Sequence, residues 1–347
     1  MFEERFLRLA RGGTVAAFLL TSLAGCGSVS SSLNPAQPDG ALDRAALKCT
    51  VAPSATITNG IHAPTAEEID GQGELYVANF QADTVTVYAT GTRHLLLTIS
   101  ADIKHPISLA FDSRGELYVG NSNGEVTVYG GRSDRLKRVI NAGMQTPQAL
   151  AFDGLGNLYV ADFSKDNVVV FAPGGDKPIR TVSNGIANPR ALAFDAAGDL
   201  YVANHTSNTI TAYAHESVKL VRTISQLVDR PAAITFDGFD NLYVANDNIN
   251  DSSVTVYAPH AGMPKRELLR GVSAPTSLAL DGFDNLYVGN SAAGERSITV
   301  YGPHSTRPIQ TYCPDVTIPV ALRFDPHGNL FVANGLSKKV TIFPAAR

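Results

Sequence analysis

Apolar and polar residues alternate along this chain in short runs, and the same runs return at a nearly fixed interval. One copy contains PRALAFD (Pro189 to Asp195), LYVAN (Leu200 to Asn204), TITAYA (Thr209 to Ala214) and LVRTIS (Leu220 to Ser225), with polar turns between them. Alternation with period two and β-branched residues are typical of strands, and no run shows the 3.6-residue period of a helix. Each copy therefore predicts four antiparallel strands, which we name a to d.

Seven copies follow one another, 41 to 44 residues apart. Their b strands begin at Leu75, Leu117, Leu158, Leu200, Leu242, Leu286 and Leu330. Four-stranded units that recur at this interval are typical of the blades of a β-propeller, in which neighbouring blades cover each other's faces. The pattern predicts an all-β fold, a seven-bladed β-propeller.

The last copy is incomplete and predicts how the ring closes. After strand c (Val340 to Phe343) the chain stops at Arg347, without a strand d. Near the other end, TITNGIHAP (Thr56 to Pro64) matches TVSNGIANP (Thr181 to Pro189), which contains a strand d. We therefore expect an N-terminal strand to complete the seventh blade, so that no sheet edge is left open there.

The N-terminus carries the features of an export signal. Three arginines (Arg5, Arg8 and Arg11) precede the apolar stretch TVAAFLLTSLAG, which is too short to span a membrane as a mature helix. It ends in LAGC (Leu23 to Cys26), which resembles the bacterial lipobox. The alternative is an ordinary signal peptide with a chance cysteine.

The lipobox resemblance implies cleavage before Cys26 and acylation of that cysteine, and more than one acyl chain gives stable anchoring. Gly27 stands where a retained inner-membrane lipoprotein has aspartate, which favours the outer membrane. We thus expect residues 1–25 to be a signal peptide, residues 26–51 a lipidated, flexible tether and residues 52–347 the propeller. The predicted location is the cell envelope, facing the periplasm or the outside.

Two cysteines remain once Cys26 is assigned to the lipid. Cys49 precedes the closing strand, and Cys313 ends strand d of the sixth blade. A pair of cysteines in an exported protein favours a disulfide, and the alternative is two free thiols.

One face of the predicted ring carries the b–c and d–a loops, and it is the candidate binding face. The differences in repeat length all fall in the b–c loops, which are longest in blades five and six, and insertions on one face of a repeat protein often mark a binding surface. His62, His105 and His205 lie there too, either as solvated side chains or as ligands. A ring of polar residues ends the b strands: Asn79, Asn121, Asp162, Asn204, Asn246, Asn290 and Asn334. These are either strand-ending residues that bond their own turns or ligand contacts.

The loop NDNINDSS (Asn246 to Ser253) is the richest in oxygen ligands. Asp247 and Asp251 are weak calcium candidates, because their spacing follows no known calcium loop. Otherwise no metal site is predicted. On the opposite face, an aspartate follows every a strand and is expected to shape a tight turn: Asp70, Asp112, Asp153, Asp195, Asp237, Asp281 and Asp325.

In the segment of strand a that reads ALAF in blade four (Ala191 to Phe194), charges break the apolar pattern only in the first and seventh blades. Glu67 and Glu68 replace the usual leucine and alanine of blade one, and Arg323 replaces an alanine of blade seven. Because unpaired charge beside the channel is costly, we expect Arg323 to pair with Glu67 or Glu68. The pair is either a lock at the seam of the ring or a polar site in the channel.

The repeat PxxLAFDxxGNLYVANxxxNxVxVY resembles NHL repeats and the related YVTN repeats of bacterial secreted propellers, over residues 54 to 347. The resemblance implies a rigid ring that binds a protein, peptide or glycan on one face. It also leaves room for an enzyme, such as a metal-dependent lactonase or a streptogramin lyase. We find no catalytic set of residues in the sequence and therefore favour a binding or scaffolding protein, expected to be a monomer without a cofactor.

The charge of the chain excludes one class of partner. Lysine and arginine number 28 against 32 aspartate and glutamate residues, a net charge of −4. No basic stripe or cluster occurs outside the signal peptide, so nucleic acid is not an expected partner.

Overall fold

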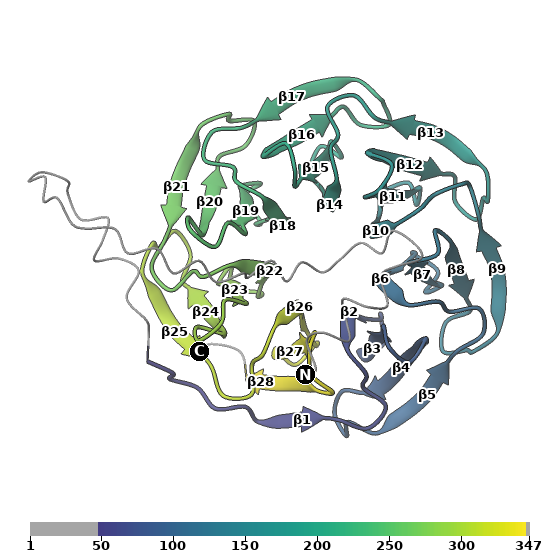
Figure 1. Ribbon diagram of the computed structural model, residues 1–347, viewed down its shortest axis with the longest axis horizontal. Coiled ribbons are helices and arrows are strands. Elements are labelled where there is room, and N and C mark those ends of the chain that lie inside the picture. The colour runs from purple at the N-terminus through teal and green to yellow at the C-terminus, as the bar shows by residue number, and fades with distance from the viewer. Residues whose placement is uncertain (1–47, 345–347) are drawn as a thin grey trace, which may run out of the picture.

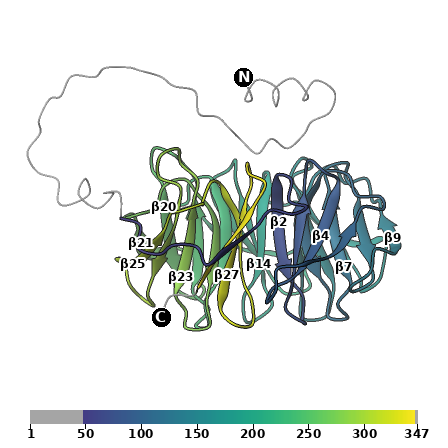
Figure 2. The ribbon, with the colours of Figure 1, turned by 90° about the horizontal axis from the view of Figure 1, so that it is seen from below.

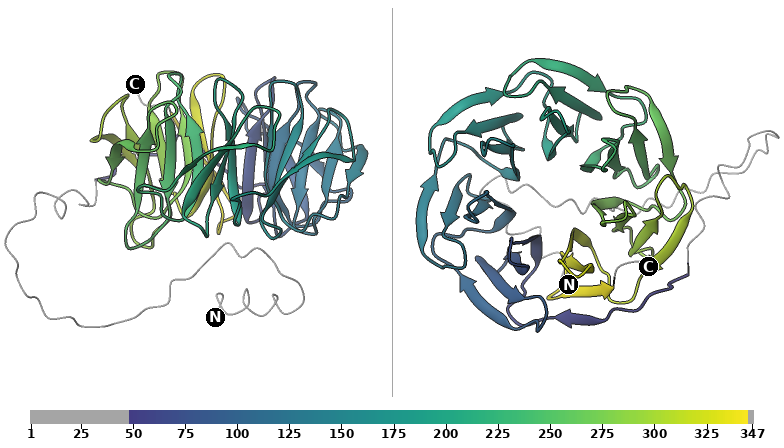
Figure 3. Two further views of the ribbon diagram at one scale, coloured as in Figure 1. Left: turned by 90° about the horizontal axis from the view of Figure 1, so that it is seen from above. Right: turned by 180° about the vertical axis from the view of Figure 1, so that it is seen from behind.

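Seven four-stranded antiparallel sheets stand around a central axis like the blades of a propeller (Figure 1). The computed structural model describes residues 48–344, which contain strands and turns but no helix, and hence no helix that would cross a membrane. In side view the strands run from one face of the disc to the other, so that the loops gather on two opposite faces (Figures 2 and 3). The predicted all-β, seven-bladed fold is confirmed.

The strands follow the predicted order in every blade, from the axis outward. Strand a is innermost, as β2 (Pro64–Ile69), β6 (Pro106–Phe111), β10 (Pro147–Phe152), β14 (Pro189–Phe194), β18 (Pro231–Phe236), β22 (Pro275–Leu280) and β26 (Pro319–Phe324). Strand b is β3 (Glu74–Asn79), β7 (Leu117–Asn121), β11 (Leu158–Asp162), β15 (Leu200–Asn204), β19 (Leu242–Asn246), β23 (Leu286–Asn290) and β27 (Asn329–Asn334). Strand c is β4 (Thr84–Ala89), β8 (Val126–Tyr129), β12 (Asn167–Phe171), β16 (Thr209–Tyr213), β20 (Ser253–Tyr257), β24 (Ser297–Tyr301) and β28 (Val340–Pro344). Strand d is outermost, as β5 (Leu95–Ile99), β9 (Leu136–Ile140), β13 (Pro178–Val182), β17 (Leu220–Ile224), β21 (Pro264–Leu268), β25 (Pro308–Tyr312) and β1 (Ala55–Ile57).

The ring closes as the sequence predicts. Strand β1 pairs antiparallel with β28, with Thr56 opposite Thr341 and Ile57 opposite Val340. The seventh blade therefore combines the last three strands of the chain with the first one. Ile57 is buried in the apolar core between blades seven and one, so the closure joins side-chain packing to backbone pairing.

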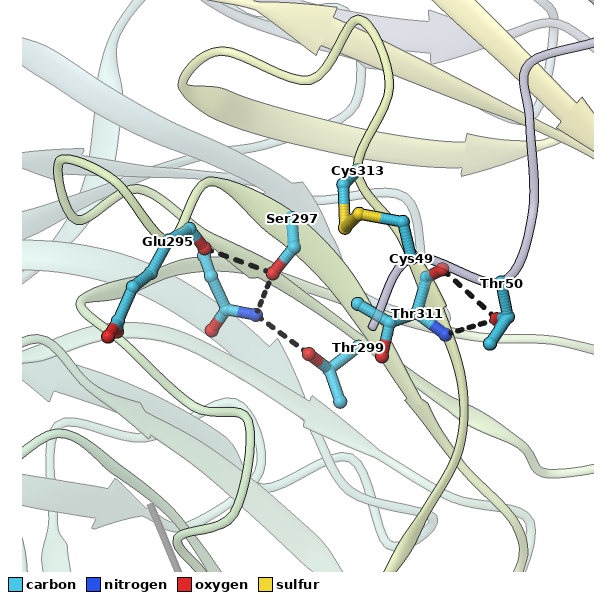
Figure 4. Close-up of a disulfide and its surroundings, with 8 residues drawn as sticks. Cys49, Thr50, Glu295, Ser297, Thr299, Thr311 and Cys313 are labelled. Carbon is cyan, nitrogen blue, oxygen red and sulfur yellow. Dashed lines mark hydrogen bonds between the residues drawn. A yellow bond between two sulfur atoms is a disulfide. The ribbon is translucent and has the colours of Figure 1, made fainter. Parts of the chain in front are cut away.

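The closing segment begins earlier than expected. We assigned residues up to 51 to the tether, but Cys49, Thr50 and Val51 are held against blade six. The Thr50 amide donates to the Thr311 carbonyl at 2.8 Å, and Val51 forms a parallel bridge with Tyr312. The Thr50 hydroxyl also bonds the backbone of Thr311 (Figure 4). The free edge of β25 offers unpaired backbone groups, which this segment satisfies. The propeller body therefore starts before residue 52.

Cys49 and Cys313 form a disulfide, which was one of the two alternatives that the sequence left open (Figure 4). The bond links residues 264 positions apart, near the two ends of the chain. Residues 49–57, which we call the closing segment, thus fasten to blade six by a covalent bond and to blade seven by strand pairing.

The blades pack through a repeated aromatic contact. The strand-b tyrosine of one blade meets the strand-a phenylalanine of the next edge to face, as in Tyr76 with Phe111 at 4.8 Å and Tyr201 with Phe236 at 5.0 Å between ring centroids. Such pairs add stability beyond the area that they bury. The strand-c tyrosines reach the d–a loops, where the hydroxyl of Tyr257 donates to the Gln226 carbonyl at 2.5 Å.

The aspartates that follow the a strands shape tight turns. In blade three, Asp153 Oδ1 accepts from the amides of Leu155 and Asn157 at 3.0 and 2.8 Å. The same two amide bonds recur in all seven blades: at Asp70, Asp112, Asp153, Asp195, Asp237, Asp281 and Asp325. This arrangement agrees with the structural role expected from the sequence.

Candidate functional site

The polar residues that end the b strands are not part of an accessible site. All seven are fully or almost fully buried: Asn79, Asn121, Asp162, Asn204, Asn246, Asn290 and Asn334. Each side-chain oxygen accepts from an amide of the d–a loop about 17 residues upstream, as Asn204 does from Ala187 at 3.2 Å. Six also donate across the blade to a strand-c hydroxyl, as Asn204 Nδ2 does to Thr211 at 2.9 Å.

We therefore correct two expectations about this ring. Its members do not line the surface of the binding face, because the d–a loop covers them. They also do more than bond their own turns, since each fastens a d–a loop to strand b. Burial without these bonds would be costly for a polar side chain, which explains why the residue recurs in every blade.

Three positions in each blade lie at the loop-face end of the innermost strand a, and we call them the mouth positions. They are the residue before the strand-a proline, the residue after it, and the residue after the strand-b asparagine or aspartate. Arginine or aspartate occupies them only in blades four and five, as Arg190, Arg230 and Asp247. His205 follows Asn204 in blade four and therefore also occupies a mouth position. We call these four residues the mouth cluster.

Arg190 and Asp247 form an ion pair between the two blades. Arg190 Nη1 donates to Asp247 Oδ2 at 3.2 Å, and the side chains are 16% and 17% exposed. Burial lowers the pKa of Arg190 and raises the pKa of Asp247, and the pairing opposes both shifts. The pair therefore ties strand β14 to the b–c loop of blade five, with both charged groups largely withdrawn from water.

His205 and Arg230 complete the mouth cluster. Burial, with Arg190 and Arg230 as nearby positive charges, lowers the pKa of His205 to about 4. His205 is therefore neutral at pH 7. Arg230 has a left-handed backbone (φ 48°), and its amide donates to Asn208 Oδ1 at 2.9 Å. Its Nε is buried and bonds no atom of residues 48–344.

The other predicted binding-face residues lie apart from this cluster. His105 is exposed and packs against Phe80 of blade one, with its Nδ1 3.5 Å from Asp83. His62 is half-buried, and its amide donates to Asn79. Asp251 is exposed in the b–c loop of blade five.

The weak calcium expectation gains no support. Asp247 is engaged by Arg190, and in the part of the chain that the structure describes no three histidine, cysteine or carboxylate side chains gather in a way that could hold a metal ion.

The seam between blades seven and one holds the predicted ion pair. Arg323 Nε and Nη2 donate to the Glu68 carboxylate at distances of 2.9 to 3.1 Å, and the two side chains are 40% and 24% exposed. Of the two partners that the sequence allowed, Glu68 is the one that pairs.

Glu67 has a different environment. It is 2% exposed, and neither carboxyl oxygen makes a hydrogen bond of ordinary geometry. Burial raises its pKa well above the usual value, which Arg323 only partly opposes. The raised pKa favours the neutral form of the Glu67 carboxyl.

The opposite face carries scattered apolar side chains. Leu155, Phe239 and Phe283 stand at the tips of a–b turns and are 56%, 64% and 76% exposed. They lie far from the mouth cluster, at the other end of the a strands. They provide reference positions for experiments on the loop face.

The structure has the architecture of a WD40-like seven-bladed propeller. The WD40 β-propeller domain of Doa1 is similar at a TM-score of 0.72 and 12% identity, covering 86% of this chain and 98% of that one. A chain of the mitotic checkpoint complex is similar at a TM-score of 0.76 and 12% identity, covering 94% of this chain and 98% of that one. No protein-family model and no curated protein matches the sequence. At this identity the likeness shows the fold alone.

The sequence reasoning named His205 and Asp247 but missed their two arginine neighbours. Arg190 follows Pro189 and Arg230 precedes Pro231, the proline that begins strand a in every blade, at positions that hold mostly apolar or small polar residues in other blades. A comparison of the seven repeats position by position, extended from strand a to the residues beside its proline, would have revealed them.

Proposed function

We propose that this protein is a non-catalytic binding or scaffolding propeller of the bacterial cell envelope, tethered to the membrane through lipidated Cys26. Its ring is built of NHL- or YVTN-type repeats, and its ligand binds on the face that carries the b–c and d–a loops. A propeller fold is consistent with such a role, because rigid blades can present loops of different sequence on one surface.

The observation that carries the proposal is the asymmetry of the loop face. The attachment of the d–a loops is the same in all seven blades, since a buried asparagine or aspartate at the end of strand b fastens each of them. In contrast, arginine or aspartate occupies mouth positions only in blades four and five, and the longest b–c loops are in blades five and six. Residues that the fold requires recur in every blade, whereas residues that contact a ligand differ from blade to blade.

The tether is tested by replacing Cys26, which lies outside the described residues, with serine. The Cys26→Ser protein is expected to leave the membrane fraction and appear among the soluble envelope proteins, because it has no acyl chain to insert. Cell fractionation followed by immunoblotting measures this, and Ser32→Ala, a change in the same N-terminal segment, is the matched control that must stay with the membrane. If the Cys26→Ser protein still sediments with membranes, the lipid anchor is excluded.

The binding face is tested by photo-crosslinking from one residue on each side of the ring. Ile249, in the b–c loop of blade five, and Phe283, on the opposite face, are 58% and 76% exposed. A photoreactive amino acid is placed at either position of the full-length chain in the source cell. We expect a discrete adduct from position 249 and none from position 283, and the reverse pattern would assign the ligand to the other face.

A further inference from the structure

We propose that the mouth cluster of blades four and five binds a carboxylate group of a peptide, either an acidic side chain or a chain terminus. The inference rests on the proposed function, because it places a particular ligand chemistry on the loop face. Three observations support it: the charge balance of the cluster, the arginine N–H groups without an acceptor among the described residues, and the exposed side chains on the same loops.

Counted over its four members, the mouth cluster carries one net positive charge, while the neighbouring Asp229 accepts from Asn248. Arg190 and Arg230 are cationic, Asp247 supplies a single carboxylate, and His205 is neutral. Arg190 is largely withdrawn from water, and the Nε of Arg230 is buried. Uncompensated charge in such surroundings is costly, and one monoanion would remove the excess.

The open donors match a carboxylate. Arg190 uses Nη1 for Asp247, and the structure assigns no bond to its other guanidinium N–H groups within residues 48–344. No described residue bonds the Arg230 side chain, although its backbone is fixed by Asn208 in a conformation that few non-glycine residues adopt. A guanidinium presents its donors as a planar fork, which suits the two oxygens of a carboxylate. The neutral imidazole of His205 can add one further N–H donor.

The surroundings favour a peptide over an acidic sugar. Leu227 and Ile249 stand on the same two loops as Arg230 and Asp247, and they are 45% and 58% exposed. Exposed aliphatic side chains on the loops that carry the cluster suit an acidic residue flanked by apolar ones. The large aromatic side chains at mouth positions, Phe80 and Phe163, belong to blades one and three and not to the cluster.

The test uses the full-length protein and two small probes that differ by one functional group. Acetyl-Leu-Glu-amide carries a carboxylate, and acetyl-Leu-Gln-amide carries an isosteric amide. Binding is followed by the NMR signal of the His205 imidazole, which is assigned by its absence from a His205→Gln variant. We expect saturable displacement of this signal by the glutamate probe, and at least tenfold weaker binding of the glutamine probe.

Two arginine variants separate a specific site from general attraction. Arg230→Asn removes the fork while keeping a residue suited to the backbone, since Asn188 adopts φ 47° at the same position of blade four. Arg296→Asn removes one exposed arginine from the b–c loop of blade six, on the same face. We expect Arg230→Asn to weaken binding of the glutamate probe at least tenfold and Arg296→Asn less than twofold, with melting temperatures unchanged.

Other outcomes overturn the inference in distinguishable ways. Tighter binding of glucuronate than of the glutamate probe would assign the site to an acidic glycan. Equal losses in both variants, or no displacement of the His205 signal by any probe, would show that the cluster is not a carboxylate site. The proposed function survives each of these results if crosslinking still occurs from position 249, and it fails on its own if the adduct forms only from position 283.

Discussion

Replacing both Cys49 and Cys313 by serine is expected to lower the free energy of unfolding by up to about 5 kcal/mol. The disulfide joins residues 264 positions apart, and a cross-link that closes so long a loop removes much of the conformational entropy of the unfolded chain. The bond also holds the closing segment against β25, next to the strand β1 that completes blade seven. Unfolding in guanidinium chloride, followed by circular dichroism, measures the loss.

Reduction supplies the matched control for this prediction. The wild-type protein in dithiothreitol is expected to unfold at the same denaturant concentration as the double variant, and the variant should not respond to the reductant. Single replacement of either cysteine should have nearly the full effect, because either one abolishes the bond. If the double variant unfolds like the oxidised wild type, the fastening of the closing segment contributes nothing to the stability of the ring.

Replacing Glu67 by leucine is expected to stabilise the protein by roughly 2 to 3 kcal/mol at pH 8. The Glu67 carboxyl is buried without an ordinary hydrogen bond, at a position where five other blades have leucine and one has isoleucine. The variant removes the unsatisfied polar group. It introduces an aliphatic side chain of the kind that the equivalent positions of the other blades hold. Glu68→Leu is the matched control, and it should destabilise because it leaves Arg323 without its partner.

The dependence of this effect on pH has a definite sign. Burial raises the pKa of Glu67 above its ordinary value of 4.5. The contribution of the neutral acid is therefore fully present below pH 4.5 and is lost as the pH rises through the higher folded-state pKa. The stability advantage of Glu67→Leu should grow over that interval and then level off. A constant difference between pH 4 and pH 8 would mean that folding does not raise the pKa of Glu67.

The fold could be predicted from the sequence because the pattern that specifies each strand is local and recurs in every blade. Period-two runs specify each strand, and seven copies at one interval specify the ring. The missing strand d of blade seven, together with its match at Thr56, specified the closure that β1 and β28 make. The backbone attachment of Thr50 and Val51 to β25 was not predicted, since no repeat contains a fifth strand from which to recognise it.

The site was harder to predict because it depends on which residues the ring brings together. The strand-b asparagines suggested a polar surface, but the d–a loops cover them, and a repeat pattern does not show which segment folds over which. Glu67 and Glu68 were equal candidates for Arg323. Adjacent residues of a strand face opposite sides of the sheet. The Glu68 side chain therefore pairs with Arg323 on the partly exposed side of β2, while the Glu67 side chain is buried on the other side. The mouth cluster joins residues from two blades that nothing in the linear sequence connects.

The crosslinking yield from position 249, compared between arginine variants in the source cell, tests the central claim most directly. If the ligand binds on the loop face through the mouth cluster, the adduct forms in the otherwise wild-type chain and in Arg296→Asn, and it is lost in Arg230→Asn. Equal adduct yields in all three proteins would contradict the role of the cluster. An adduct from position 283 and none from position 249 would contradict the loop face itself.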